Sequence, residues 1–219
     1  PRELAFTGSG AQANNQAIKG AFTPRQKKGR HLITSSIEHP AVLKTCQYLE
    51  ELGFQITYLP VDRYGMVDPE EVRKSITPET ILITLMHSNN EVGTIQPVQE
   101  IGQIARIHGI LFHTDAIQSV GKLPVDVRSL GVDFLSISAH KIYGPKGVGA
   151  LFIKEGTLIE PLHHGGHHEL NRRAGTENVS GIVGFGKASE LAFEELERNR
   201  ENIEPLRDHF WEKIRQGID

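Results

Sequence analysis

The segment Ser136-Ile-Ser-Ala-His-Lys141-Ile-Tyr-Gly-Pro-Lys-Gly147 decides the fold, because it places a lysine directly after the apolar run 132–137. Lys141 is therefore expected at the mouth of a buried strand, between a histidine with small hydroxyl residues and a glycine-rich turn. Such a lysine is partly desolvated, which favours loss of its proton and Schiff-base formation, and nearby hydroxyls can hold a phosphate. On this segment alone, Lys141 is equally a solvated lysine on a loop.

A second segment, Ile110-Leu-Phe-His-Thr-Asp115-Ala-Ile-Gln118, favours a cofactor site. Pyridoxal 5'-phosphate (PLP) needs an anion against its ring nitrogen and a donor near its phenolic oxygen, and Asp115 and Gln118 suit these two roles. Asp115 also suits a helix N-cap that follows a strand. The two interpretations are compatible, because ligands bind at the strand ends of open α/β sheets.

The chain alternates between strand-like and helix-like segments, which predicts an α/β fold with a mostly parallel sheet covered by helices on both faces. Strands are expected at residues 4–7, 31–34, 55–59, 80–85, 111–114, 134–138 and 149–153, and helices at 12–22, 41–52, 99–108 and 181–200, with a charged helical pattern continuing to about residue 216.

Six motifs, in order along the chain, resemble those of the NifS/IscS-type cysteine desulfurases, which are fold-type I PLP enzymes of the class-V aminotransferase family. Each motif is a weak signal alone, but their shared order is specific. The motifs are Ser36-Ile-Glu-His-Pro-Ala-Val42, Met86-His-Ser-Asn-Asn-Glu-Val-Gly93, His113-Thr-Asp-Ala-Ile-Gln118, Ser138-Ala-His-Lys141, Gly165-Gly-His-His-Glu169 and Arg173-Ala-Gly-Thr-Glu-Asn178.

The resemblance implies an aspartate-aminotransferase-like large PLP domain over residues 1–190 and a helical linker over 191–219 toward a missing small domain. The chain is then truncated at both ends. Lys141 becomes the Schiff-base lysine, and His39 becomes the residue that stacks on the PLP ring and assists proton transfers. A neutral imidazole suits both tasks of His39, although a lone histidine at a helix start is more often a cap or a surface residue.

The phosphate end of the cofactor is expected between two segments. Ser138 and His140 resemble the family's phosphate contacts, and a hydroxyl with an imidazole N–H offers two donors to one dianion. The glycine-rich turn 7–15 brings Gly10 and Ala11 to a helix N-terminus, where N–H groups are free. Ala11 stands where the desulfurases carry a threonine, so backbone N–H groups or Ser9 would substitute; this loop is closer to that of serine hydroxymethyltransferases.

Two further polar residues follow from the resemblance. Asn90 can donate to the substrate carboxylate or to the phenolic oxygen of PLP, although asparagine after a strand is most often a turn residue. Thr176 lies on the loop that reaches the neighbouring subunit's phosphate in this family, so a homodimer is expected. The histidines at 163–168 have metal-like spacing, but Gly165 and Gly166 break helical geometry, and no metal is expected.

Composition excludes several classes of protein. The net charge of -3 gives no basic surplus for nucleic acid or an anionic membrane, and no apolar run is long enough to span a bilayer. The single cysteine, Cys46, excludes an intrachain disulfide framework and fits the cytoplasm, or an organelle matrix if a transit peptide has been removed. Cys46 lies mid-helix without a visible thiolate-stabilising group, so it is expected to be an inert packing thiol.

The resemblance therefore implies a cysteine desulfurase, which converts L-cysteine to L-alanine and passes sulfur to an enzyme cysteine as a persulfide for iron–sulfur cluster biosynthesis. Sulfur-acceptor or scaffold proteins would be partners of the intact enzyme. The catalytic cysteine and the substrate-clamping arginine lie C-terminally in the family, so this chain alone is expected to be inactive. Selenocysteine lyase uses the same scaffold and remains open, as does a PLP-free binding or dimerisation module.

Overall fold

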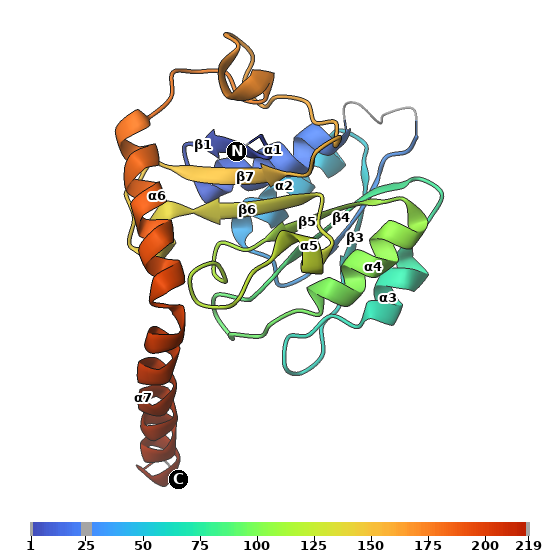
Figure 1. The fold of residues 1–219 in the computed structure, drawn as a ribbon. Helices are drawn as coiled ribbons and strands as arrows, with labels where there is room; N and C mark the ends of the chain where they lie inside the picture. Colours follow the sequence, from blue (N-terminus) through green and yellow to red (C-terminus); the bar gives the residue numbers. More distant parts are fainter. Residues whose placement is uncertain (1, 23–27, 218–219) are drawn as a thin grey trace.

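The computed structural model describes residues 2–22 and 28–217, which form a single seven-stranded sheet with helices packed on it (Figure 1). The spatial order of the strands is β1 (Leu4–Thr7), β7 (Gly149–Ile153), β6 (Phe134–Ser138), β5 (Leu111–Asp115), β4 (Thr80–Met86), β2 (His31–Ser35) and β3 (Gln55–Leu59). The pairs from β6 to β3 are all parallel, whereas β7 is antiparallel to both β6 and β1. The predicted mostly parallel sheet is confirmed.

Helices cover both faces of this sheet. On one face lie α1 (Gly10–Phe22) and α2 (Pro40–Glu51), and on the other lie α3 (Pro69–Ser75), α4 (Val98–His108) and the short α5 (Val127–Leu130). The ends of the helices follow ordinary capping chemistry: Asp68 and Asp126 accept hydrogen bonds from the first turns of α3 and α5, and α4 ends at Gly109 with φ 65°.

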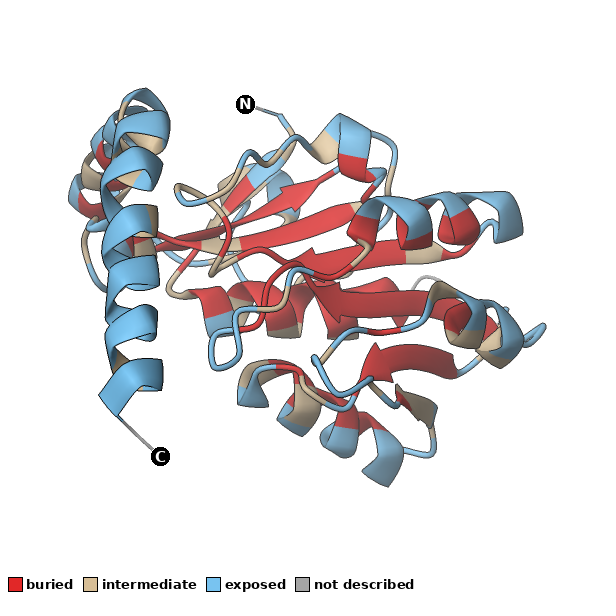
Figure 2. Cartoon of the chain, turned by 90° about the horizontal axis from the view of Figure 1, so that it is seen from below, coloured by how far each residue is buried: buried red, intermediate tan, exposed pale blue. Residues whose placement is uncertain are grey.

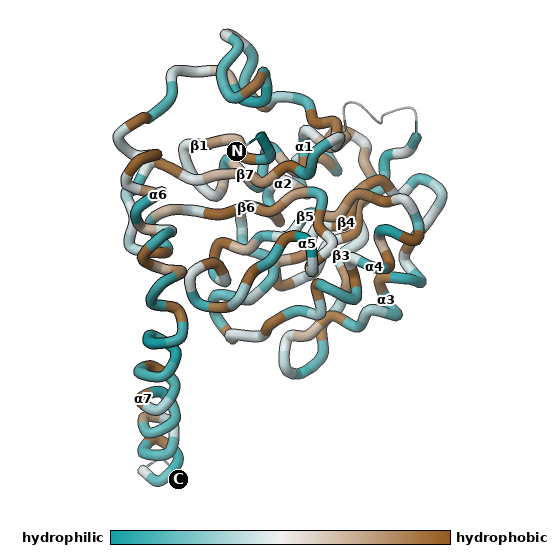
Figure 3. Tube along the Cα trace, in the orientation of Figure 1, coloured by the Kyte–Doolittle hydropathy of each residue, from teal (hydrophilic) through white to brown (hydrophobic). Residues whose placement is uncertain are grey.

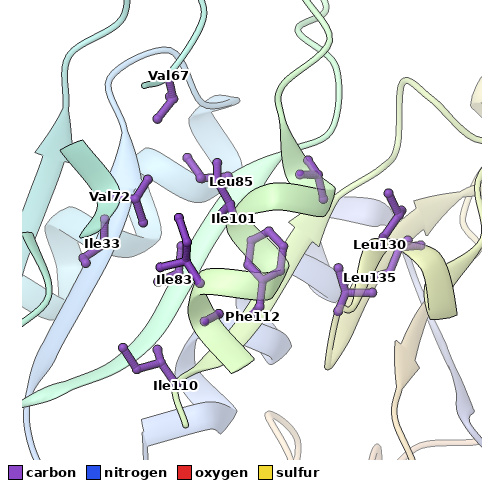
Figure 4. Packing of buried hydrophobic residues seen from close by; sticks show 14 of the residues in the cluster. Ile33, Val67, Val72, Ile83, Leu85, Ile101, Ile110, Phe112, Leu130 and Leu135 are labelled. Atoms are coloured by element: carbon purple, nitrogen blue, oxygen red, sulfur yellow. The ribbon is translucent and has the colours of Figure 1, made fainter. Parts of the chain in front are cut away.

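The strand sequences divide their apolar side chains between the two faces. Ile33 and Ile83 pack with α3 and α4, whereas the adjacent Leu32 and Leu82 pack with α1 and α2. This alternation follows from the two-residue side-chain period of a strand. Figure 4 shows Ile33, Ile83 and Phe112 in the first of these layers, and Figure 2 shows buried strands beneath helices that are exposed only on their outer sides.

The observed strands agree with the predicted ones to within one residue at each end. The predicted helix 181–200 is wrong in its boundaries, because α6 (Val179–Glu194) ends before Glu195 and a separate helix, α7 (Leu196–Gly217), follows. The helix α7 has no buried residue and extends away from the sheet with a mainly hydrophilic surface (Figures 1 and 3). The division at residue 190 stays a prediction.

Candidate active site

A cavity of about 230 Å³ opens where β4, β5 and β6 end, next to the N-terminal ends of α1 and α2. Nine of the ten predicted site residues line it, and only Thr176 does not. The lining residues are Ser9, Gly10, Ala11, His39, Met86, Ser88, Asn90, Asp115, Ile117, Gln118, Ser138, His140 and Lys141. Two larger hollows of about 650 and 640 Å³ contain none of the predicted residues. The convergence of an amine, a carboxylate and two imidazoles therefore identifies the smaller cavity as the candidate site.

Asp115 provides a buried, oriented carboxylate on the wall of the cavity. Its Oδ2 accepts a hydrogen bond from Asn14 Nδ2 at 2.7 Å, and its Oδ1 accepts one from the backbone N–H of Ile117 at 3.0 Å. Burial raises the pKa of Asp115, while these two hydrogen bonds and the nearby side chains of His39 and Lys141 act in the opposite direction. The geometry thus supports an anion at this position, and a cation in the cavity would stabilise it further.

The close approach of α1 to the sheet depends on Gly10. A Cβ at Gly10 would lie 2.3 Å from Ile117 Cδ1 and 3.2 Å from Ser138 Cβ, so a larger residue would push the helix away from the ends of β5 and β6. Ser9 Oγ accepts a hydrogen bond from the backbone N–H of Gln12 at 3.1 Å and so caps α1. Gly10 and Ala11 occupy the first helical positions, whose N–H groups have no acceptor within the helix.

A second group of donors lies beside this helix end. Ser138 ends β6, and its Oγ lies 3.0 Å from His140 Nδ1 in the short 3-10 helix η2 (Ala139–Ile142). Together with the N-terminus of α1, the two side chains surround one part of the cavity with hydrogen-bond donors. Such an arrangement is suited to a phosphate dianion.

Lys141 also lies on η2 and lines the cavity together with Gln118. The neighbouring Lys122 Nζ donates to Gln118 Oε1 at 3.0 Å, so the amide oxygen of Gln118 is occupied and its NH₂ group remains for another partner. Burial and the charge of Lys141 lower the pKa of Lys122. The sequence did not indicate Lys122, but its position orients Gln118 as the expected donor.

His39 combines the two roles that were weighed for it. Its Nδ1 accepts a hydrogen bond from the backbone N–H of Ala41 at 3.0 Å and caps α2, while the residue also lines the cavity. A neutral His39 then carries its proton on Nε2. The turn after β4 contacts the segment between β2 and α2 that contains His39. Asn89 Nδ2 donates to the carbonyl of Ile37 at 2.9 Å, and the next residue, Asn90, lines the cavity.

Sequence reasoning missed several residues of the site. Asn14 and Glu38 contribute buried polar side chains, and Met86 and Ser88 line the cavity. For Asn14 the available signal was a polar residue on the buried, small-residue face of α1. For Glu38 it was direct adjacency to His39.

The remaining predicted features lie elsewhere. Cys46 is fully buried in α2, and burial raises its pKa to about 12, which confirms a packing thiol. Thr176 is exposed on the segment before α6, and its expected contact with a second subunit stays a prediction. Across residues 2–22 and 28–217 no group of three or more His, Cys, Asp or Glu is arranged to hold a metal ion.

Comparison with known proteins gives a consistent result over the whole chain. The aminotransferase class-V family model matches residues 1–217. A protein named cysteine desulfurase IscS from Dictyoglomus turgidum is 57% identical over 216 residues, and one of the same name from Methanosarcina thermophila is 56% identical over 212 residues. These matches cover 99% and 97% of this chain but 55% and 52% of the relatives, so the chain spans about half of their length.

Solved structures agree with the sequence matches. A NifS-like protein superimposes with a TM-score of 0.96 at 43% identity, covering 99% of this chain and 60% of that protein. A structure of SspA in complex with cysteine superimposes with a TM-score of 0.84 at 48% identity, covering 87% of this chain and 55% of that protein. Within the part of the chain that the structure describes, no helix is long and apolar enough to cross a membrane.

Proposed function

Because the chain belongs to the aminotransferase class-V family, whose members use PLP, we propose that the cavity at Lys141 binds PLP and that the chain is the cofactor-binding part of a cysteine desulfurase. The observation that carries the proposal is the meeting of Lys141, Asp115 and the α1 N-terminus in one cavity, although they are far apart in the sequence.

The residues present fit PLP by their chemistry. Asp115 offers a buried carboxylate to a ring nitrogen; burial raises its pKa, so a protonated ring nitrogen beside it would stabilise the ionised form. Gln118 offers its NH₂ group to a phenolic oxygen, since Lys122 occupies its amide oxygen. The donors around Ser138 and the N-terminus of α1 suit a phosphate, even though Ala11 has no hydroxyl.

When bound, PLP supplies an electron sink for breaking bonds at the α-carbon of an amino acid. Lys141 would provide the amine that attaches the cofactor and, when free, would take up or return a proton at that carbon. Asp115 would hold the proton on the ring nitrogen, and His39, whose Nδ1 is occupied by the Ala41 N–H, would offer Nε2 for proton transfer beside the cofactor. Asn90 is placed to donate to a substrate carboxylate.

The proposed substrate is L-cysteine and the product L-alanine, with the sulfur passed to a cysteine of the intact enzyme. The relatives named cysteine desulfurase and the solved SspA complex with cysteine support this choice. Cys46 is unsuited as the sulfur acceptor, because it is fully buried. The intact enzyme would act in the cytoplasm or an organelle matrix as a homodimer, with Thr176 near the partner's cofactor, and would deliver sulfur to acceptor or scaffold proteins for iron–sulfur clusters.

The test is reductive trapping of the cofactor. The chain is incubated with PLP, reduced with borohydride and digested, and the modified peptide is identified by mass spectrometry. The label should appear on Lys141 and be absent from Lys141→Ala, whereas Lys146→Ala, which changes an exposed lysine outside the cavity, should be labelled like the original chain. A reducible adduct that persists in Lys141→Ala would refute the assignment.

A further inference from the structure

Glu38 is a buried acidic residue that the proposed chemistry does not use. It lies in the connection between β2 and α2, immediately before His39, and is only 4% exposed. Acidic side chains are almost never fully buried unless they are paired with a cation or fully hydrogen-bonded. Its partners therefore indicate what it does.

One carboxyl oxygen of Glu38 joins two strands. Its Oε1 accepts hydrogen bonds from Ser35 Oγ at 2.7 Å and from the backbone N–H of Met86 at 2.9 Å. The register between β2 and β4 ends at the pair Ile33 and Ile83, so the side chain of Glu38 supplies an acceptor to Met86 beyond the end of the backbone ladder. Glu38 thus holds the His39 connection against the end of β4.

The other carboxyl oxygen indicates the protonation state. Oε2 of Glu38 is buried and has no hydrogen-bond partner among the described residues. An ionised carboxylate would leave negative charge on this unpaired oxygen, which is far more costly than burying a neutral carboxyl.

The charged neighbours agree with a neutral Glu38. The charge of Asp115 on β5 acts on Glu38, and its carboxylate receives two N–H donors, so Asp115 is the better place for the single negative charge. The second titratable neighbour, Cys46 on α2, is a buried neutral thiol. Burial is the main cause that raises the pKa of Glu38 to about 8, and the charge of Asp115 adds to it.

We propose that Glu38 is a positioning residue that stays protonated beneath the cavity and holds the His39 connection to the end of β4. A neutral carboxyl provides the acceptor for Met86 without placing a second negative charge beside Asp115. Ionisation would add that charge and would disturb the position of His39 and Met86, both of which line the cavity.

The first measurement is an infrared titration of this chain without cofactor. The C=O band of a protonated carboxylic acid should disappear with a midpoint near pH 8, and this titrating component should be absent from Glu38→Gln. In Asp115→Asn the midpoint should move to lower pH, because a neighbouring negative charge is removed. Glu91→Gln, which changes an exposed carboxyl in the turn after β4, should leave the titration unchanged.

The second measurement is PLP affinity at pH 7, and this arm rests on the proposed function. Glu38→Gln keeps a neutral acceptor for Met86, so its dissociation constant should stay within about twofold of the original. Glu38→Ala loses both hydrogen bonds and should bind at least about tenfold more weakly. Circular dichroism of each variant separates this effect from unfolding.

The two proposals can fail separately. If the original chain does not bind PLP, the proposed function is wrong, while the infrared titration still decides the state of Glu38. If the titrating band remains in Glu38→Gln, or if Glu38 titrates near its ordinary pKa of 4.5, the protonated state is refuted. If Glu38→Gln loses PLP as fully as Glu38→Ala, the positioning role of a neutral carboxyl is refuted.

Discussion

Asn14 Nδ2 donates to Asp115 Oδ2 over 2.7 Å and thereby joins the first helix to the end of β5. Because a hydrogen bond to a charged group contributes about 1.5–3 kcal/mol, Asn14→Ala should weaken PLP binding roughly ten- to hundredfold. The measurement is a fluorescence or absorbance titration with PLP. The matched control is Asn15→Ala, since the side chain of Asn15 donates to the Ala11 carbonyl at the exposed side of α1, away from Asp115. Equal affinities of the two variants would show that Asn14 does not support Asp115.

Removing the carboxylate of Asp115 is expected to lower activity more than removing the hydrogen bond that Asn14 donates to it. On the proposed function, Asp115→Asn removes the anion that would keep the ring nitrogen of PLP protonated. In a full-length enzyme that contains this segment, a loss of about 4 kcal/mol of transition-state stabilisation corresponds to a roughly thousandfold lower kcat. Steady-state assays of alanine formation, with PLP saturation verified, measure this effect. Near-normal turnover would remove Asp115 from the mechanism.

The thiol of Cys46 is expected to be unreactive in the folded chain. Its side chain is fully buried and its pKa is raised to about 12, so the thiolate population at neutral pH is negligible. The folded chain should resist alkylation by iodoacetamide, and with PLP, cysteine and a reductant it should release no sulfide above a PLP-only background. Cys46→Ala is the control. Sulfide release that depends on Cys46 would contradict both the burial and the assignment of the sulfur acceptor to another part of the enzyme.

The buried side chain of His113 is expected to make the stability of the fold sensitive to acid. It lies across three strands, with Nδ1 2.7 Å from Thr84 Oγ1 and Nε2 2.9 Å from Ser136 Oγ, and burial lowers its pKa to about 3. Between pH 6.5 and 3 the unfolded chain binds a proton that the folded chain does not, so stability falls as pH falls, by up to about 1.4 kcal/mol per unit.

This acid dependence is measured by urea unfolding at several pH values. His113→Gln should be less stable at pH 7 but should lose less stability on acidification, while His108→Gln, at an exposed end of α4, should follow the original chain. Glu38 acts in the opposite sense, because its raised pKa means that stability falls as pH rises from 4.5 to 8. Parallel slopes for His113→Gln and the original chain would exclude a neutral buried His113.

The sequence predicted the parts of the fold that depend on local patterns. Apolar runs such as 80–85 identified the strands, and the motifs placed Lys141, Asp115 and His39 at strand ends that the sheet then brings together. The break between α6 and α7 was not predictable, because the charged helical pattern continues through Glu195 without a proline or glycine.

Contacts between distant segments explain the other omissions. Asn14 and Asp115 are separated by 101 positions, and Lys122 acts through Gln118 rather than on the cavity. Neither relationship has a signature in local sequence, because it arises only when the helix and the strand ends meet. Glu38 was within a recognised motif, but its importance depends on Met86, which lies on another strand.

The position of β1 has a consequence for the order of events during protein synthesis. Among the strands that the structure describes, β1 comes first in the chain, yet it pairs with β7, which comes last. The chain following β1, which includes Gly10 and Asn14, therefore cannot take its final place against β5 and β6 until nearly all of the sheet has been translated. A nascent chain that stops before residue 149 lacks the partner of β1, so the cavity that α1 helps to form is complete only after β7 has been made.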